Sequence, residues 1–242
     1  MWHSRGYVQI ISYLCSSEIA LMDKKLIDTR ECYFYTNPES RFLLVQPVDG
    51  GELELMDREV ELIGELSGKP FSLACLLIRD WNTELTPWTA PPVFGKVPFG
   101  SNASDTLDFI IKHLLPQEDT ERLHCLLGGY SLAGLFALWA ACQTNKFESV
   151  VAASPSVWYP EWLSYASQHK PLATSVYLSL GDKEERTKNK VMSGVGNAIR
   201  EMHGLLSGGD INTILEWNPG NHFVDSEKRM AKGFAWAMKQ IK

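Results

Sequence analysis

The segment Leu123-His-Cys-Leu-Leu-Gly-Gly-Tyr-Ser-Leu-Ala-Gly-Leu-Phe-Ala-Leu-Trp139 does most to decide the fold. It opens with an apolar run of strand length and closes with an apolar run that continues at helical length to Cys142, so a glycine-rich turn joins a strand to a helix. A serine at such a turn, here Ser131, is held in a strained backbone conformation that projects its hydroxyl over the carboxyl edge of a sheet. The residues two before and two after it must be small, and they are Gly129 and Ala133.

Ser131 has two interpretations. It could simply cap the helix that follows, because serine is a common N-cap residue. The strand before it, the helix after it and the small residues on both sides favour a nucleophile instead. The start of the helix would also place the backbone N–H of Leu132 near a developing oxyanion. We therefore predict that Ser131 is a nucleophile and that Leu132 contributes to an oxyanion hole.

From about residue 42 the chain repeats the same strand-then-helix unit. Apolar runs predict strands at 42–48, 71–78, 123–127, 150–153, 175–180 and 211–217. Apolar residues at helical spacing predict helices at 53–66, 107–114, 135–142, 191–206 and 230–241, with Pro116 closing the second. Repeated units with short connections indicate an α/β fold with a mostly parallel central sheet and helices on both faces, in one domain over residues 22–242.

The general base and its acid are expected after the later strands. Among six histidines, His222 lies after the last predicted strand and before the last helix, in a segment rich in Asn, Pro and Gly that should form a turn. The acid should follow the preceding strand, which ends at Gly181, so both Asp182 and Glu184 are candidates. We favour Glu184, because the acid of this fold often lies a few residues beyond the strand-ending glycine, whereas Asp182 has the shorter reach.

The proline-rich stretch 79–101 has no periodicity, and a loop of that length is more often a binding loop than a simple connection. A second oxyanion donor is expected from the start of this stretch, with Trp81 as the best single candidate. Several aromatic residues are expected in loops near the same edge, where they would either line a pocket or cap the core: Trp81, Trp88, Trp158, Tyr159 and Trp162. The candidate substrate-binding residues are Tyr130, Trp88, Trp158 and Arg79.

Composition excludes several classes of protein. The 242 residues are 45% hydrophobic and 21% charged, which is typical of a globular protein and not of a disordered one. The formal net charge of −6 disfavours a nucleic-acid partner, and no window approaches the roughly 18 to 20 apolar residues of a membrane span. We expect a small-molecule substrate; the oligomeric state is not readable.

Residues 1–21 are expected to be an extension outside the core. The weakly apolar run 6–15 makes a poor secretory signal, and translation could start at Met1 or at Met22. The five cysteines form no C-x-x-C pair, which indicates free thiols in a reducing, cytoplasmic compartment.

Four motifs occur in an order that resembles a known family: 129–139 around Ser131, 154–158 (Ser-Pro-Ser-Val-Trp), 180–185 (Leu-Gly-Asp-Lys-Glu-Glu) and 220–223 (Gly-Asn-His-Phe). Together they resemble the esterase family of α/β-hydrolases that includes siderophore (enterobactin-type) esterases and esterase D/S-formylglutathione hydrolases. The segment 80–88 is similar to the oxyanion loop of that family. The resemblance implies an α/β-hydrolase fold, with Ser131 as nucleophile, His222 as histidine and the segment 182–184 as the source of the acid.

These observations predict a serine esterase that cleaves carboxylic or thioesters through a Ser-His-acid triad and an acyl-enzyme, with no metal and no cofactor. Three alternatives remain: an acyltransferase on the same site, a siderophore trilactone esterase, and a non-catalytic scaffold. An anionic siderophore would need a basic pocket. Arg79 is one nearby candidate for such a pocket. Because the net charge of the chain is negative, a small ester is favoured.

Overall fold

The structure is a computed structural model that describes residues 22–118 and 122–241, so the predicted extension 1–21 lies outside the described residues. Within the described part, eight strands form one sheet in the order β1-β2-β4-β3-β5-β6-β7-β8. The strands are β1 Asp23–Ile27, β2 Arg30–Tyr35, β3 Phe42–Val48, β4 Ser72–Leu77, β5 His124–Tyr130, β6 Ser149–Ala153, β7 Ser175–Gly181 and β8 Asn212–Asn218.

The prediction of a mostly parallel sheet is confirmed. The six strands from β3 to β8 are parallel to one another, and β2 alone among the described strands runs against both of its neighbours. Because the strands are parallel, their carboxyl ends meet at one edge, where β5 and β7 are separated only by β6. Residues that follow these strands are therefore brought close together even when they are far apart in sequence.

The hairpin of β1 and β2 was not predicted from the sequence. Its turn is made by Asp28 and Thr29, which have φ angles of 43° and 69°. A two-residue hairpin turn of this kind usually carries glycine or asparagine, because positive φ is costly for other residues. The turn therefore lacks the residues by which a hairpin is normally recognised.

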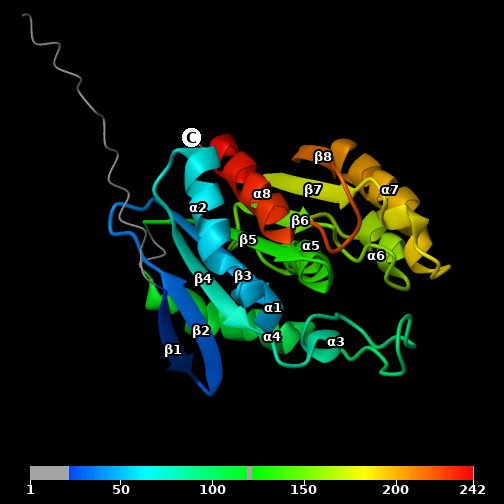
Figure 1. Cartoon of the computed structure of the whole chain (residues 1–242), viewed down its shortest axis with the longest axis horizontal. Helices are drawn as coiled ribbons and strands as arrows, with labels where there is room; N and C mark the ends of the chain where they lie inside the picture. The colour runs from blue at the N-terminus through cyan, green and yellow to red at the C-terminus, as the bar shows by residue number, and fades with distance from the viewer. Residues whose placement is uncertain (1–21, 119–121, 242) are drawn as a thin grey trace, which may run out of the picture.

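Helices cover both faces of the sheet, as predicted (Figure 1). Helices α2 and α8 pack side by side on one face, where α8 contacts β5, β6 and β7, whereas α5 lies on the opposite face and α7 contacts β7 and β8. The helices are α1 Gly50–Leu53, α2 Met56–Ser67, α3 Trp81–Glu84, α4 Ala103–Phe109, α5 Leu132–Gln143, α6 Trp162–Gln168, α7 Val195–Ser207 and α8 Ser226–Gln240.

Helix α5 is apolar around its whole circumference, with ten of its residues buried. A helix of this composition has no face for solvent and must be enclosed by the fold. It belongs to the larger of two hydrophobic cores, while α2 and α8 belong to the smaller core on the other face of the sheet.

Three predicted helices differ in detail from the observed ones. The helix expected at 53–66 is divided into α1 and α2. The helix expected at 107–114 changes from α4 to a π-helical turn, Ile110–Leu114, and Pro116 lies inside a following 3₁₀ turn, Leu115–Gln117. The helix expected at 191–206 begins with a 3₁₀ turn, Met192–Gly194, ahead of α7.

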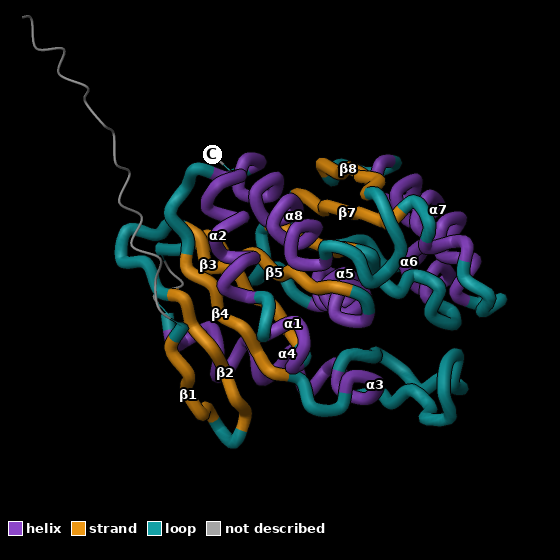
Figure 2. The backbone as a smooth tube through the Cα atoms, viewed as in Figure 1, coloured by secondary structure: helices purple, strands orange, loops and turns teal. Residues whose placement is uncertain are grey.

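The long segment 79–101 contains the short helix α3 and extends away from the body of the sheet at the lower right of Figure 2. In the described residues no helix combines the length and apolarity needed to cross a membrane. The described cysteines, Cys32, Cys75, Cys125 and Cys142, are free thiols, and the fifth cysteine, Cys15, lies outside the described residues.

Glu59 on α2 is a buried carboxyl group with few hydrogen-bond partners. It is 3% exposed, its Oε2 accepts a long hydrogen bond of 3.4 Å from Gln46, and its Oε1 has no hydrogen-bond partner in the described structure. Burial therefore raises the pKa of Glu59 well above its ordinary value of 4.5. A carboxyl group of this kind stabilises the fold fully below its unfolded pKa, and that contribution is lost as the pH rises.

Replacing Glu59 by Gln keeps the shape of the side chain and removes its titration. We expect Glu59→Gln to be about as stable as the wild type at pH 4 and progressively more stable than it from pH 5 to pH 8. The difference should grow by at most about 1.4 kcal/mol per pH unit. Urea unfolding of both proteins from pH 4 to pH 8 measures this difference in the free energy of unfolding. If the difference does not change with pH, the raised pKa of Glu59 is contradicted.

Candidate active site

Ser131 lies at the sharp turn between β5 and α5. Its backbone has φ 57° and ψ −120°, a conformation that residues with a side chain rarely adopt. The turn is held by backbone hydrogen bonds from the N–H of Ser131 to the carbonyl of Ala153 and from the N–H of Ser156 to the carbonyl of Ser131. No side-chain hydrogen bond of Ser131 caps α5, so its hydroxyl is available for another partner.

The close approach of β5 and α5 explains the small residues beside Ser131. A Cβ atom at Gly129 would lie 2.3 Å from the carbonyl carbon of Ala133 and 2.7 Å from its Cβ. Such distances are impossible for real atoms, so glycine is required at residue 129. The larger the residue at 133, the further the helix would be pushed from the strand.

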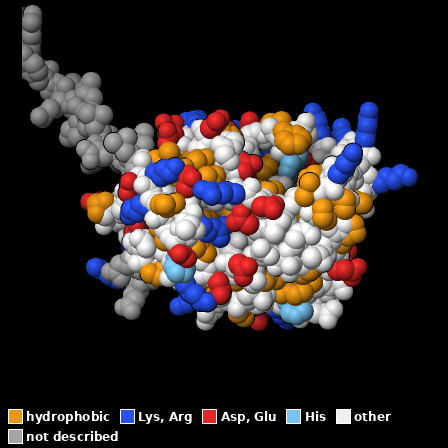
Figure 3. All heavy atoms as spheres, turned by 90° about the horizontal axis from the view of Figure 1, so that it is seen from below, with side chains coloured by type: hydrophobic (Ala, Val, Ile, Leu, Met, Phe, Trp, Pro, Cys, Tyr) orange, Lys and Arg blue, Asp and Glu red, His pale blue; other side chains and the backbone are white. Residues whose placement is uncertain are grey.

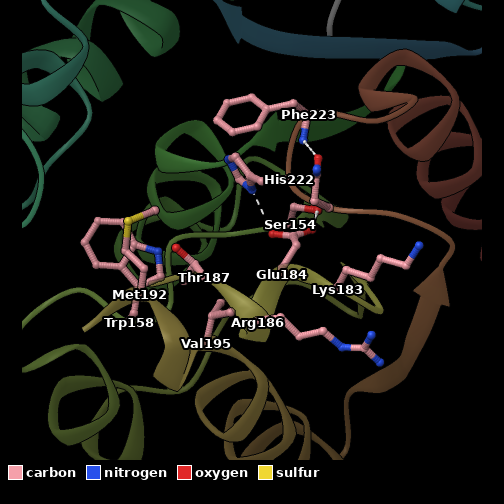
Figure 4. A pocket seen from close by; sticks show the side chains of 11 residues that line it. Ser154, Trp158, Lys183, Glu184, Arg186, Thr187, Met192, Val195, His222 and Phe223 are labelled. Carbon is pink, nitrogen blue, oxygen red and sulfur yellow. Dashed lines mark hydrogen bonds and ion pairs between the residues drawn. The ribbon is translucent and has the colours of Figure 1, made fainter. Parts of the chain in front are cut away.

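Three side chains from the carboxyl edge form a continuous hydrogen-bonded row. The Nε2 atom of His222 lies 3.0 Å from Ser131 Oγ, and its Nδ1 atom lies 2.7 Å from Glu184 Oε2. The dashed line that starts at the His222 ring in Figure 4 marks its contact with Glu184. An ionised carboxylate can only accept, so Nδ1 carries the hydrogen in a neutral imidazole and Nε2 is left to accept from the serine hydroxyl.

The Glu184 side chain is 4% exposed and sits on a 3₁₀ turn, Glu184–Arg186, that follows β7. Its Oε1 accepts hydrogen bonds from the N–H of Gly181 and the hydroxyl of Ser154, each at 2.7 Å. Burial alone would raise the pKa of Glu184, but hydrogen bonds from His222, Ser154 and Gly181 outweigh it and lower the pKa. The group is therefore ionised at neutral pH.

Asp182, the other candidate acid, has a different partner. Its Oδ1 accepts a hydrogen bond of 2.9 Å from the N–H of Gly220, and the N–H of Asp182 donates to the carbonyl of Asn218. Asp182 thus ties the end of β7 to the loop that carries His222. The structure brings Glu184, and not Asp182, into contact with the histidine.

A cavity of about 420 Å³ opens beside His222 and Glu184. In Figure 4 Trp158 and Met192 lie together at one end of it, Phe223 lies beyond His222, and the side chains of Lys183 and Arg186 point away from the Trp158 end. The full lining is Ser154, Trp158, Lys183, Glu184, Arg186, Thr187, Met192, Val195, Asn221, His222 and Phe223.

Of the four substrate-binding residues predicted from the sequence, Trp158 lies in the wall of this cavity. Tyr130 is 5% exposed, and its hydroxyl donates to the carbonyl of His222 at 2.8 Å. Arg79 is exposed and forms an ion pair with Glu31. None of the lining residues is Tyr130, Arg79 or Trp88.

The other predicted aromatic residues form a cluster beside the cavity. The Trp88 indole N–H donates to the carbonyl of Pro160, and the Trp88 ring packs against Tyr159 and Tyr165. Trp162 was expected in a loop, but it begins α6 and is fully buried. It belongs to the core because α6 turns this side chain into the larger hydrophobic cluster.

The two predicted oxyanion donors lie at comparable places in the fold. Leu132 is the first residue of α5, and Trp81 is the first residue of α3, which follows β4. The first N–H groups of a helix have no acceptor within the helix. Just before α3, the N–H groups of Arg79 and Asp80 both donate to Glu84 Oε1, which fixes the start of this turn.

Several residues at the site were missed in the sequence. Ser154 is one, since its hydroxyl bonds Glu184, and Arg229 on α8 is another, with its Nη1 2.7 Å from Glu184 Oε1. The only sequence signal for Arg229 was its position beside the apolar stripe of the last helix. Among the described residues, no group of three or more His, Cys, Asp or Glu side chains could hold a metal ion.

The fold is similar to those of several solved siderophore esterases. The siderophore hydrolase EstB from Aspergillus nidulans superposes with a TM-score of 0.66 at 18% identity, over 89% of this chain and 93% of that one. EstA from the same organism gives 0.66 at 19%, over 88% and 91%. The enterobactin esterase FES from Shigella flexneri, solved with enterobactin, gives 0.68 at 16%, over 92% of this chain but only 59% of that one.

These likenesses establish the α/β-hydrolase fold that the motifs predicted. Because the sequence identities are below 20%, these similarities support the fold but do not establish the activity. No protein-family model matches the chain, and no curated protein matches it by sequence.

The tight contact between β5 and α5 makes Gly129→Ala a sharp test of the turn at Ser131. We expect this change to lower the free energy of unfolding by about 1–3 kcal/mol, because the added methyl group must push the helix from the strand. Gly64→Ala in α2 is the matched control, since a Cβ there meets no atom within 4 Å. That variant should be more stable than wild type by about 0.5–1 kcal/mol. Equal effects of the two changes in urea unfolding would contradict the close approach.

Proposed function

We propose that this protein is a serine esterase in which Ser131, His222 and Glu184 form the catalytic triad. The observation that carries the proposal is the unbroken row from Ser131 Oγ through both nitrogens of His222 to Glu184 Oε2, with distances of 3.0 and 2.7 Å. Nucleophile, base and orienting acid in this arrangement are the parts that acyl transfer needs.

In the proposed reaction, Ser131 Oγ attacks the ester carbonyl carbon while His222 Nε2 takes the hydroxyl proton. The imidazolium, steadied by Glu184, then gives that proton to the leaving alcohol or thiol, and an acyl-serine remains. Water, deprotonated by His222, attacks the acyl-serine and releases the acid, which restores the serine hydroxyl. The N–H groups of Leu132 and Trp81 are the proposed donors to the oxyanion.

Ester cleavage, rather than another use of the triad, is supported by the structural neighbours, which include two siderophore hydrolases and an enterobactin esterase. The size of the cavity supports a small-molecule substrate, because about 420 Å³ falls within the usual range for such pockets.

A second candidate is an anionic ester, such as a catecholate siderophore. The cavity is lined by Lys183 and Arg186, and neither side chain has a hydrogen-bond or ion-pair partner in the described structure. Figure 3 shows Lys and Arg side chains gathered at the end of the molecule where the segment between β7 and α7 lies. This local positive charge could favour an anion although the whole chain carries a net charge of −6.

The triad is tested by hydrolysis of p-nitrophenyl acetate and butyrate. Ser131→Ala should lower kcat at least about 10³-fold, and Glu184→Gln should lower it by a similar factor, because the amide no longer fixes the imidazole tautomer. Asp182→Asn, which leaves the His222 contact in place, should retain kcat within about ten-fold.

Ser164→Ala is the control, since Ser164 is an exposed residue of α6. A fluorophosphonate probe should label the wild type and this control, but not Ser131→Ala. Equal turnover by Ser131→Ala and wild type would overturn the proposed nucleophile. A larger loss in Asp182→Asn than in Glu184→Gln would exchange the roles of the two acids.

The charge of the substrate is tested with paired esters that differ only in a carboxylate. If the anionic candidate holds, Lys183→Glu and Arg186→Glu should each lower kcat/KM for the charged ester about ten-fold or more and leave the neutral ester within two-fold. The loss should shrink as salt is added. Arg79→Glu is the control, because Arg79 lies outside the cavity lining, and it should change neither rate. If Lys183→Glu and Arg186→Glu lower kcat/KM equally for the charged and the neutral ester, the anionic candidate is contradicted and a small neutral ester is favoured as the substrate.

A further inference from the structure

Arg229 is a charged residue in the interior of the protein. It lies in the first turn of α8 and is 1% exposed. An arginine is almost never fully buried unless its charge is compensated and its donors are used. The planar guanidinium group offers donors in several directions at once, so its partners show what it holds in place.

One nitrogen of the group faces the proposed triad. Arg229 Nη1 lies 2.7 Å from Glu184 Oε1, 2.9 Å from Ser154 Oγ and 3.0 Å from the hydroxyl oxygen of Tyr130. The Ser154 hydroxyl in turn donates to Glu184 Oε1. The carboxylate thereby keeps Oε2 for His222 while Oε1 is fixed from two sides.

A second nitrogen, Nη2, faces the loop that carries the histidine. Arg229 Nη2 donates to the carbonyl oxygens of Asn221 at 2.8 Å and Pro219 at 3.3 Å. The loop is held again one residue further on, because the Tyr130 hydroxyl donates to the carbonyl of His222. Tyr130 immediately precedes Ser131, so this link joins the histidine backbone to the strand that presents the nucleophile.

We propose that Arg229 is the positioning residue of the active site, setting His222 and Glu184 relative to Ser131 through its two guanidinium nitrogens. This inference rests on the proposed triad. A residue that merely offset the charge of Glu184 would need only one contact to it. Arg229 instead reaches four segments: the end of β5, the residue after β6, the turn after β7 and the loop before α8.

The packing around Gly181, Glu184 and Arg229 is tight. A Cβ atom at Gly181 would lie 2.9 Å from both Arg229 Nη2 and Glu184 Oε1, and 2.5 Å from the carbonyl oxygen of Gly220. Arg229 is not among the residues that line the cavity, so it acts on catalysis through other residues and not through the substrate.

Charge and geometry can be separated, because lysine keeps the charge but not the two-pronged fork. A positive charge beside the Glu184–His222 pair disfavours protonation of the imidazole, and its removal favours protonation. The charged and titratable groups that adjoin the pair are Tyr130 on β5, Arg229 on α8 and, on the segment after β7, Asp182, Lys183 and Arg186. Of these, only Arg229 is both cationic and buried against the carboxylate.

The experiment compares Arg229→Lys and Arg229→Gln with wild type in p-nitrophenyl ester hydrolysis from pH 5 to pH 9. Arg229→Lys should lower kcat about 10-fold or more with the acid limb of the kcat/KM profile in place. Arg229→Gln should lower kcat further, about 10²-fold, and move the acid limb up by about one pH unit. KM should stay within about two-fold in both. Loss of folded protein alone would scale the rate without moving the limb.

Tyr130→Phe tests the same idea while it leaves the Arg229–Glu184 ion pair in place, although it removes one acceptor of Arg229 Nη1. It removes the bond to the His222 carbonyl and should lower kcat several-fold with KM and the acid limb unchanged. Wild-type kcat in Tyr130→Phe, or folded Arg229 variants with kcat within two-fold of wild type, would overturn the positioning role. An acid limb that stays in place in Arg229→Gln would also overturn it. Failure of the triad itself is distinguishable, because it would appear as turnover and probe labelling by Ser131→Ala.

Discussion

The close contact between β5 and α5 is the constraint on which the site depends. The two elements approach so nearly that no side chain fits at Gly129, and the chain can turn between them only if Ser131 adopts a positive φ. Such a conformation costs of order 1–3 kcal/mol and persists only where the surroundings enforce it. Here they do, since α5 is enclosed by apolar neighbours on every side and cannot shift to relieve the strain. The strained turn aims the serine hydroxyl at the edge of the sheet.

The parallel sheet then brings the serine, the histidine and the acid to one edge. Ser131 and His222 are 91 residues apart, yet they follow β5 and β8, whose carboxyl ends lie at the same edge. The acid follows β7, between them in the sheet as in the chain. The segments after β7 and β8 are joined directly by hydrogen bonds from the N–H groups of Asp182 and Lys183 to the carbonyls of Asn218 and Gly220. The segment that carries the acid is therefore tied directly to the segment that carries the histidine.

The sequence was informative where a local pattern has a single physical meaning. Buried strands, apolar helices and the turn at Ser131 could be predicted, because their residues satisfy rules that act within a few positions. The β1–β2 hairpin could not, since the turn residues Asp28 and Thr29 carry no hairpin signature. The burial of Arg229 could not be predicted either, because its partners come from segments up to 99 residues away. The positions of Lys183 and Arg186 beside the cavity likewise could not be predicted, because they depend on how the turn after β7 folds.

The choice between Asp182 and Glu184 shows where sequence reasoning stops. Both follow the same strand, and their spacing from its last glycine favours Glu184 without excluding Asp182. The difference arises because the 3₁₀ turn folds Glu184 back until its Oε1 receives the N–H of Gly181, whereas Asp182 receives the N–H of Gly220. A carboxylate that must meet both a guanidinium group and an imidazole needs one oxygen for each. Glu184 divides its oxygens between Arg229 and His222, and the shorter Asp182, already bonded to the histidine loop, is committed to holding that loop in place.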